Sequence, residues 1–408
     1  MPLAGYVQFA ATHRRFIGFG FAMAFASSFG QTYFIGIFGP SVQQEFGLSH
    51  TAWGSIYMIG TLASALVLPW TGKQIDRLNL LPYTLLACSL LIIACMFVTF
   101  TTGVLSLTIA IFLLRQSGQG LMSHVAITSM ARYFDKQRGR AIAIATIGFA
   151  VGEALLPFIA VAVISIIGWR WSYRAAACFL LVVFIPSIFV FLKNHAQRHA
   201  DHLRQLDDNA DTSSTSVRSW TRAEVMHDRR FLMLLPGILT PSMILTSMFF
   251  HHLNLADAKQ WSYSWITGSY VIYAAAVTIT SLASGPLIDK YSAVRLVPYM
   301  LGPLVAAMVV IAIFDNPWTA WIYFILAGIN VGIAHTAVSA IWAELYGVAH
   351  LGAIKSLFAA LGVFSSALGP VIAGSLMDRG ITIEQVCLLF AGYALFGAVL
   401  IRIALRSA

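Results

Sequence analysis

Charged side chains are scarce in this chain. Only 10% of its 408 residues are Asp, Glu, Lys or Arg, whereas 59% are hydrophobic. A soluble domain carries about 25% charged residues, so the composition excludes an ordinary soluble globular protein. One membrane-spanning helix needs about 20 apolar residues, and the chain is therefore long enough for about a dozen spans. We predict an all-α membrane protein.

Cysteines and catalytic motifs are also scarce. The four cysteines lie within apolar runs and lack the spacing of metal ligands, so we interpret them as packing residues. The sequence contains no G-x-x-x-x-G-K-[ST] phosphate loop, no H-E-x-x-H and no G-x-S-x-G. These absences argue against an ATP-driven pump and against an enzyme, and we predict neither a cofactor nor a metal ion.

Long apolar runs separated by polar breaks predict twelve spans. Most of the 25 Lys and Arg residues fall on one side of this arrangement, and by the positive-inside rule both chain termini then lie in the cytoplasm. We interpret the basic excess as a topology signal, not as a nucleic-acid-binding surface. The predicted spans are 16–38, 52–71, 80–102, 105–133, 140–166, 172–192, 230–253, 262–286, 293–314, 318–345, 351–376 and 385–405.

The longest polar segment divides six spans from six. We predict an N-terminal six-helix bundle over 1–192, a cytoplasmic linker over 193–229 and a C-terminal six-helix bundle over 230–408. The linker mixes charges with Ser and Thr, a composition typical of a flexible segment. It contains four histidines, but a flexible segment would not hold a metal site in shape, and we predict no metal there.

The two halves repeat each other. One constant sequence separation joins Gly72 to Gly285, Asp76 to Asp289, Gly139 to Gly352 and Pro157 to Pro370, and it also places Arg77 opposite Lys290. Parallel repeats of this kind are found in secondary transporters. We therefore predict two pseudo-symmetric halves.

Several motifs resemble those of the major facilitator superfamily. GKQIDR (72–77) resembles the family's cytoplasmic signature G-x-x-x-D-R, and GPLIDK (285–290) resembles its second-half copy. RQSGQG (115–120) only loosely resembles the R-x-x-x-G element of span four, because its glycines are Gly118 and Gly120. The resemblance covers nearly the whole chain and implies a twelve-helix fold that transports solutes by alternating access.

A narrower resemblance is to the bacterial monocarboxylate and oxalate/formate porter-like group. It depends on GPSVQQEFGLSHTAW (39–53), ARYFDKQRGRA (131–141) and GWRW (168–171). This resemblance implies a monomer in the bacterial inner membrane that works on a small organic anion.

The repeated signature predicts a conformational latch on the cytoplasmic side. Gly72 permits a tight turn, and Asp76 would meet either the N-terminus of a neighbouring helix or an Arg of the loop between spans four and five. The resemblance implies that the latch stabilises the outward-open state. In the alternative interpretation, Lys73 and Arg77 only enforce topology. The predicted latch residues are Gly72, Asp76, Arg77, Arg138, Gly285, Asp289 and Lys290.

Polar residues within the spans are the candidate site, because charge inside a bilayer is costly and usually functional. Arg115 lies near the middle of span four, with Gln119 on the same helix face, and Glu153 lies at similar depth in span five. Two interpretations stay open: Arg115 and Glu153 form a structural ion pair, or Arg115 binds an anionic substrate while Glu153 carries a proton. Gln31 and Thr32 in span one would bond to substrate or, alternatively, join helices.

Other candidates lie in the second half. His251 and His252, near the outer end of span seven, would serve proton coupling or gating, because histidine titrates near neutral pH. His335 in span ten and Tyr270 and Tyr273 in span eight are substrate-binding candidates. For each of these five residues, simple packing is the alternative.

These observations predict a secondary transporter for a small organic anion, a monocarboxylate, coupled to protons or to an exchanged anion. The alternative is proton-coupled efflux of drugs or amphipathic metabolites. Drug antiporters of the superfamily carry a Gly-Pro-rich signature in span five. Glu153 stands where that signature would be expected, which argues against efflux.

Overall fold

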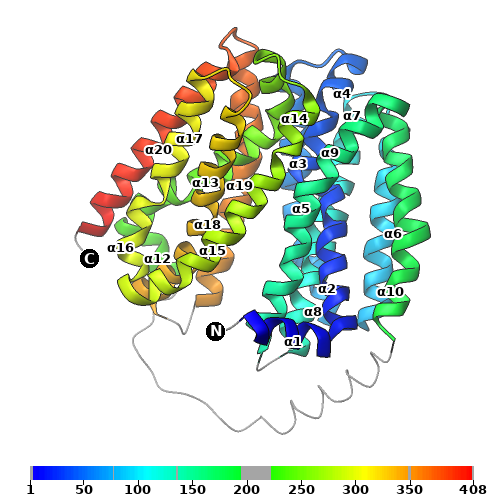
Figure 1. Cartoon of the computed structure of the whole chain (residues 1–408), viewed down its shortest axis with the longest axis horizontal. Coiled ribbons are helices and arrows are strands. Elements are labelled where there is room, and N and C mark those ends of the chain that lie inside the picture. Colours follow the sequence, from blue (N-terminus) through cyan, green and yellow to red (C-terminus); the bar gives the residue numbers. More distant parts are fainter. Residues whose placement is uncertain (1–2, 77, 135–136, 194–221, 348–350, 407–408) are drawn as a thin grey trace, which may run out of the picture. The chain divides into compact units, whose positions relative to one another are not determined.

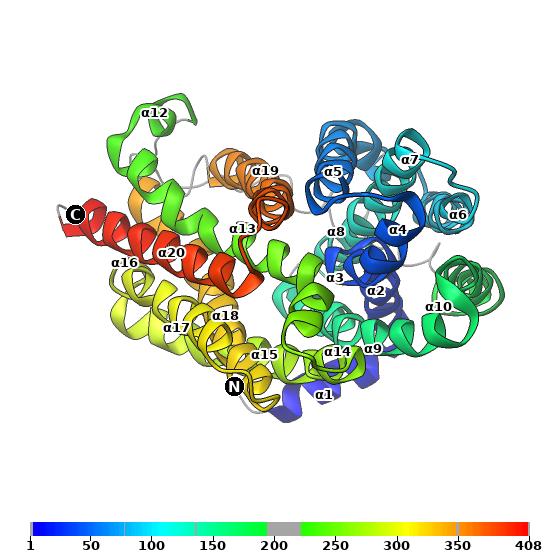
Figure 2. The same ribbon diagram turned by 90° about the horizontal axis from the view of Figure 1, so that it is seen from above.

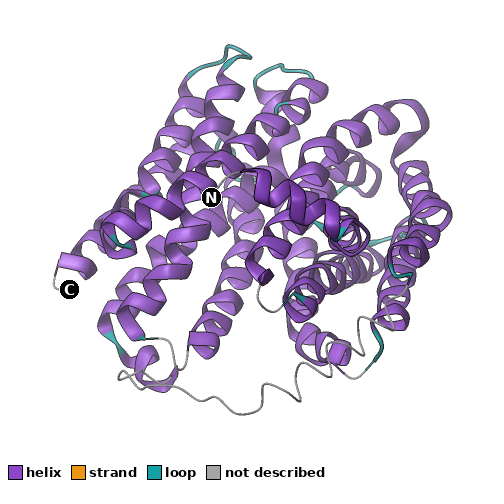
Figure 3. Cartoon of the chain, turned by 60° about the horizontal axis from the view of Figure 1, so that its bottom comes forward, coloured by secondary structure: helices purple, strands orange, loops and turns teal. Residues whose placement is uncertain are grey.

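The computed structural model describes residues 3–76, 78–134, 137–193, 222–347 and 351–406. All regular structure in these ranges is helical, with no strand among them (Figure 3). Helices are expected because a bilayer offers no hydrogen-bond partners, so each spanning segment must satisfy its own backbone groups.

Among the described residues, ten helices are long and apolar enough to cross a membrane. Two further spans are present, one as a bent pair of helices and one within a longer helical segment. The first span is a bent pair of helices, Arg14–Gly30 and Thr32–Phe46. The segment Arg138–Phe191 holds two spans, because Gly168 within it has a non-helical backbone with φ of 76° and ψ of 164°. The twelve predicted spans are thus all accounted for.

The chain divides into two compact units. The first comprises Met1–Ile35 and Ile59–Thr215, and the second comprises Gly36–Met58 and Ser216–Ala408. The predicted linker, 193–229, lies mostly outside the described residues, so the predicted domain boundaries remain a prediction.

The first unit is built around α2 and α9, which pack against each other and against α8 (Figure 1). α6 contacts both α9 and α7. Small residues permit the close approach of these helices: a Cβ atom at Gly148 on α9 would collide with the Phe21 carbonyl of α2. The elements that lie wholly or partly in this unit are α1 (Leu3–Thr12), α2 (Arg14–Ala26), η1 (Ser27–Gly30), α3 (Thr32–Ile35), α5 (His50–Gly72), η3 (Lys73–Asp76), α6 (Leu80–Val98), α7 (Val104–Leu114), η4 (Arg115–Met122), α8 (Ser123–Tyr133), α9 (Arg138–Phe179), η6 (Leu180–Phe184) and α10 (Ile185–Phe191).

The second unit packs α13 against α19 and α20, α15 against α18, and α17 against α18 and α20 (Figure 2). It also includes the start of α5. Its glycines again mark close helix contacts, since a Cβ atom at Gly237 on α13 would lie 2.6 Å from the Gly397 carbonyl of α20. The other elements of this unit are η2 (Gly36–Phe38), α4 (Gly39–Phe46), α12 (Arg222–His227), α13 (Arg229–Ala258), α14 (Tyr263–Gly268), α15 (Tyr270–Tyr291), α16 (Ala293–Leu296), η7 (Val297–Tyr299), α17 (Leu301–Ile313), α18 (Thr319–Tyr346), α19 (Leu351–Met377) and α20 (Ile383–Arg406).

Candidate functional site

The first span is broken in its middle. Its first half ends at Gly30, Gln31 is extended with φ of −84° and ψ of 155°, and α3 begins at Thr32. The two halves are bent by 44°. A helix end leaves backbone carbonyls without helical partners, and such groups are costly in a bilayer unless another group bonds to them.

Arg115 supplies that bond. Its Nη1 atom donates to the Gly30 carbonyl at 3.2 Å and lies 3.4 Å from the Thr32 hydroxyl. The side chain is only 1% exposed. The structure therefore brings together Arg115 and Thr32, two of the predicted substrate-binding residues, and places a guanidinium group at the break in span one.

The helix that carries Arg115 is itself irregular at this level. Residues Arg115–Met122 form a π-helical segment, a rare geometry that is frequent at functional sites. Span four approaches the break through a glycine, because a Cβ atom at Gly118 would lie 2.7 Å from the Gly30 Cα and N atoms. This contact fixes the distance between Arg115 and the broken backbone.

Glu153 lies on another side of the broken span. The Tyr33 hydroxyl donates to the Ser28 hydroxyl at 2.8 Å, and Glu153, half-buried on α9, interacts electrostatically with Tyr33. α9 approaches closely here, since a Cβ atom at Gly152 would collide with the Ser28 side chain. In this structure Arg115 and Glu153 thus have different neighbours. Tyr33 is absent from the predicted site, although it lies in the same polar stretch.

The glutamines near Arg115 differ in their roles. Gln31 and Gln119 are both half-buried, and the Gln119 backbone packs against Gly30 at the break. The sequence prediction omits Gln116, whose buried side chain donates to the Thr71 hydroxyl at 2.8 Å and accepts from the Ser64 hydroxyl at 3.0 Å. Gln116 therefore joins span four to span two. Its only sequence signal is its place next to Arg115.

The predicted residues of spans seven and eight meet in the second unit. His252 is fully buried between two hydroxyls, with Nδ1 2.8 Å from Tyr270 and Nε2 2.9 Å from Tyr323. Phe249 and Phe324 pack around the ring, and Tyr273 packs on Phe249. The grouping of His252 with Tyr270 was not predicted, and neither was the participation of Tyr323.

The side chain of His251 contacts span eleven. Its Nε2 lies 3.1 Å from the Pro370 carbonyl, and its Nδ1 lies 3.3 Å from the Asn254 side-chain oxygen. His335 is on α18 of the same unit with its side chain exposed. One turn further along α18, the Ser339 hydroxyl accepts a hydrogen bond from Lys355 at 2.7 Å.

The start of α5 and the end of α19 form a close contact, which we call the α5–α19 contact. The Asp378 carboxylate accepts from the backbone N–H groups of His50 at 3.0 Å and Thr51 at 2.8 Å. These are first-turn donors that α5 leaves unpaired. Glycines let the helices touch, since a Cβ atom at Gly54 would lie 2.9 Å from the Pro370 carbonyl, and one at Gly374 would collide with the backbone of His50.

Partial burial opposes the charged form of Asp378, but the hydrogen bonds from Thr51, Ser49 and His50 outweigh it and lower the pKa to about 2. The pKa in the folded state is thus below the ordinary value of 3.8. The stabilisation by this carboxylate is then complete above that ordinary value and is lost as pH falls toward 2. At neutral pH the α5–α19 contact is fully charged.

The predicted latch residues lie at the other ends of the helices. Gly72 is buried beside His124, and nearby Arg132 donates to the Ile75 carbonyl at 3.2 Å. Glu344 binds the matching turn of the second half, accepting from the N–H groups of Ala293 and Val294 at 2.8 and 3.2 Å.

The structure says little about the role of the remaining predicted latch residues. Arg138 and Lys290 are exposed, Lys290 lies 5.0 Å from the Tyr291 ring centroid, and a Cβ atom at Gly285 would meet open space. Arg77 and the side chains of Asp76 and Asp289 lie outside the described residues, so the latch stays a prediction.

Together these features define a multi-pass helical membrane protein of the transporter class, with irregular helices and buried polar groups within its spans. The model of the Major Facilitator Superfamily matches residues 20–370 and 259–407, and the chain belongs to this family. Its general activity is therefore transport across a membrane. A comparison with curated proteins finds no match.

Solved structures support the fold. A bacterial homolog of the human lysosomal transporter Spinster, in an inward-facing and unoccupied conformation, matches with a TM-score of 0.66 and 15% identity over 97% of both chains. The nucleoside transporter NupG matches with a TM-score of 0.73 and 13% identity over 96% of this chain and 98% of that one. At these identities the likeness extends to the fold alone, and it confirms the predicted twelve-helix, two-half architecture.

The Gly30–Gly118 contact predicts a stability difference between two glycines. Gly118→Ala should lower the free energy of unfolding by about 1–3 kcal/mol, because the added methyl overpacks the contact between spans one and four. Gly392→Ala is the matched control, since Gly392 on α20 has open space around it. Thermal unfolding of the purified protein measures both, and equal melting temperatures would contradict the proposed close contact.

The α5–α19 contact predicts a local change in backbone protection. Asp378→Asn should speed hydrogen–deuterium exchange in a peptide covering residues 49–58 by about two- to fivefold, because it removes the charge that caps α5. Mass spectrometry would measure the exchange, with peptides of α17 as the internal reference. Arg379→Gln, a change at the exposed next residue, should leave the exchange unaltered. An unchanged rate in Asp378→Asn would mean that this carboxylate does not hold the helix start.

Proposed function

We propose that this protein is a secondary transporter that moves a small organic anion, a monocarboxylate, by alternating access, coupled to protons or to an exchanged anion. The main observation in support of this proposal is the buried guanidinium of Arg115 at the break in span one. Discontinuous helices commonly form the substrate sites of secondary transporters.

A carboxylate suits this position chemically. A guanidinium group presents a planar fork that binds a carboxylate through two parallel hydrogen bonds. In the present conformation the Nη1 atom donates to uncharged oxygens of Gly30 and Thr32. A carboxylate would form stronger, charge-assisted bonds. Because Arg115 is buried here, an anion would reach it only after the site opens, as alternating access requires.

Glu153 is the proposed proton carrier. Between residues 77 and 192 the only acidic residues are Asp135, in the loop after span four, and Glu153, within span five. A proton on Glu153 would offset the charge of an incoming anion, because the two binding events then add no net charge to the first unit. Its neighbour Tyr33 belongs to the same broken span as Thr32, which offers a physical connection between the two sites.

Nucleosides and amphipathic compounds are two alternative substrate classes. One structural neighbour is a nucleoside transporter, and the alternative suggested by the sequence is efflux of amphipathic compounds. Neither a neutral nucleoside nor an apolar drug requires a buried arginine in the membrane, where a charged side chain costs about 2.5–3.5 kcal/mol even on the most lenient scale. A monocarboxylate is therefore the better match.

The substrate class is tested by uptake into proteoliposomes. We expect accumulation of lactate, pyruvate, formate or oxalate, no accumulation of uridine, and no energy-dependent extrusion of an amphipathic dye. Arg115→Gln keeps a donor for the Gly30 carbonyl but removes the charge. Because hydrogen bonds to charged groups contribute about 1.5–3 kcal/mol, this change should lower anion uptake at limiting concentration by about tenfold or more.

Two variants control this experiment. Arg115→Lys retains the charge and should recover part of the uptake, and Arg379→Gln removes an exposed charge elsewhere and should transport normally. Normal uptake of a monocarboxylate by Arg115→Gln would refute the role of the arginine. Uptake of uridine alone would refute the substrate class.

Glu153→Gln separates coupling from binding. This variant should still exchange labelled for unlabelled anion, because substrate binding is intact. It should no longer accumulate anion against a gradient when a proton gradient is imposed. Counterflow and pH-driven uptake in the same liposome preparation measure the two activities. Proton-driven accumulation by Glu153→Gln would exclude Glu153 as the proton carrier.

A further inference from the structure

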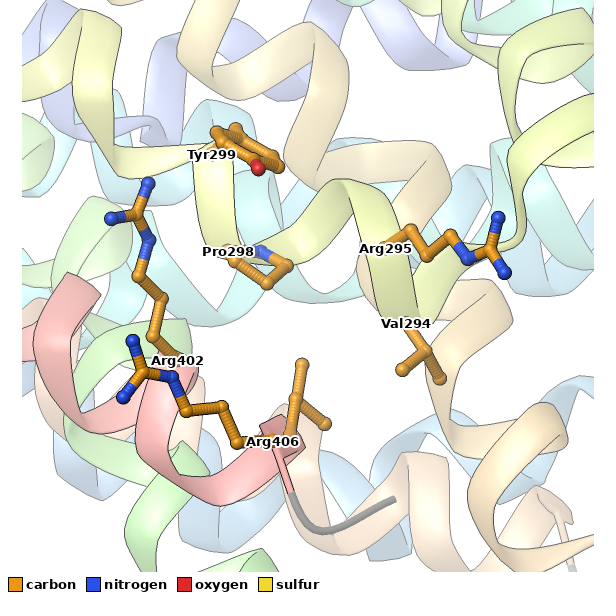
Figure 4. Close-up of a pocket in the computed structure, with 7 residues that line it drawn as sticks. Val294, Arg295, Pro298, Tyr299, Arg402 and Arg406 are labelled. Carbon is orange, nitrogen blue, oxygen red and sulfur yellow. The ribbon is translucent and has the colours of Figure 1, made fainter.

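Three arginines surround a surface pocket at one end of the second unit. The cavity, about 500 Å³ in volume, lies between the short helices α16 and η7 and the end of α20 (Figure 4). In the close-up, Arg402 and Arg406 come from α20, and Arg295 comes from α16 with its guanidinium pointing away from α20. The complete lining is Val294, Arg295, Pro298, Tyr299, Arg402, Leu405 and Arg406.

The charge of this pocket is of one sign. Arg295, Arg402 and Arg406 are all exposed, and the pocket lining contains no acidic residue. Glu344 shares a neighbouring pocket with Arg295, but its carboxylate binds the backbone N–H groups of Ala293 and Val294. The guanidinium of Arg402 lies 5.3 Å from the Tyr299 ring centroid. An anion bound in the pocket would offset the like charges of these arginines, with Arg402 and Arg406 on the same turn of α20 as the direct donors.

An apolar stripe leads along α20 to this pocket. Leu388, Leu395 and Val399 are 46%, 57% and 48% exposed, and the next residues on the same helix face are Arg402 and Arg406. Residues spaced three and four apart share a helix face. In a membrane-spanning helix, an exposed apolar stripe of this kind contacts acyl chains. The arginines stand where that stripe ends.

The distribution of other charged residues in the second unit is consistent with lipid headgroups lying at the same end as the pocket. Arg229, Arg230 and Lys290 lie at helix ends on the same side of the unit as the pocket. At the opposite end Lys259 is paired with Asp315 at 2.6 Å, and the charge of Arg379 is offset by Asp257, Asp378 and Glu384. Basic pockets between membrane helices on the cytoplasmic side bind anionic lipid headgroups.

We propose that this pocket binds the phosphate headgroup of an anionic phospholipid whose acyl chains lie along the α20 stripe. The arginines bind the phosphate, and the stripe distinguishes a lipid from a free phosphate ion, because only a lipid covers apolar surface. This site is separate from Arg115 and does not depend on the identity of the transported solute.

Native mass spectrometry and thermal unfolding of the detergent-purified wild type test the source of the phosphate. Phosphatidylglycerol should remain bound and raise the melting temperature. Phosphatidylcholine, inorganic phosphate and glycerol phosphate should do neither. Stabilisation by inorganic phosphate equal to that by phosphatidylglycerol would overturn the lipid assignment, and so would equal binding of phosphatidylcholine.

Variants test the residues. Arg295→Gln, Arg402→Gln and Arg406→Gln should each weaken phosphatidylglycerol binding by about fivefold, because each basic residue near a membrane surface contributes about 1 kcal/mol. Arg379→Gln, at the opposite end, is the control and should bind as the wild type does. Val399→Ser should weaken binding as well, since it removes apolar surface above the pocket. Wild-type affinity in all three arginine variants would refute the site.

Discussion

The hydrogen bond from Arg115 to the Gly30 carbonyl satisfies the constraint on which the first unit depends. A bilayer does not tolerate an unpaired backbone group, and it does not tolerate an uncompensated arginine either. The break in span one and the charge in span four each lower the cost of the other, because the carbonyl and the guanidinium bond to each other. Neither feature would be stable alone at this depth, so the irregular backbone and the buried cation have to occur together.

Glycines set the geometry in which this mutual compensation is possible. Gly30 meets Gly118 of span four, and Gly152 of span five meets Ser28 just before the break. Without hydrophobic driving force between helices in lipid, close backbone packing is the main source of association. The broken stretch is therefore held from two sides by helices that carry Arg115 and Glu153. The positions of both side chains are therefore fixed by close contacts at glycines, most of them to backbone atoms.

The twelve spans could be predicted from sequence because in a bilayer the helix is the only structure open to a long apolar run. Arg115 and Thr32 could be selected because polar residues stand out in such runs. The contact between Arg115 and Thr32 could not be predicted, because it depends on a backbone break at Gly30–Gln31 that no residue pattern indicates. Likewise Asp378 lies in an exposed loop, and only packing brings it to the start of α5, 328 residues away in the sequence. The partners of His252 depend on packing in the same way.

Carboxylates at helix starts recur at both ends of the second unit. Glu344 binds the first N–H groups of α16, and Asp378 binds those of α5. An exposed charge at a helix start contributes about 0.3–1 kcal/mol, whereas an arginine buried without partners costs several times more. Both carboxylate contacts join helix segments of the second unit. The loss of the Arg115 contact inside span one should therefore cost more than the loss of either carboxylate contact, and the proposed substrate would have to replace it with a stronger bond.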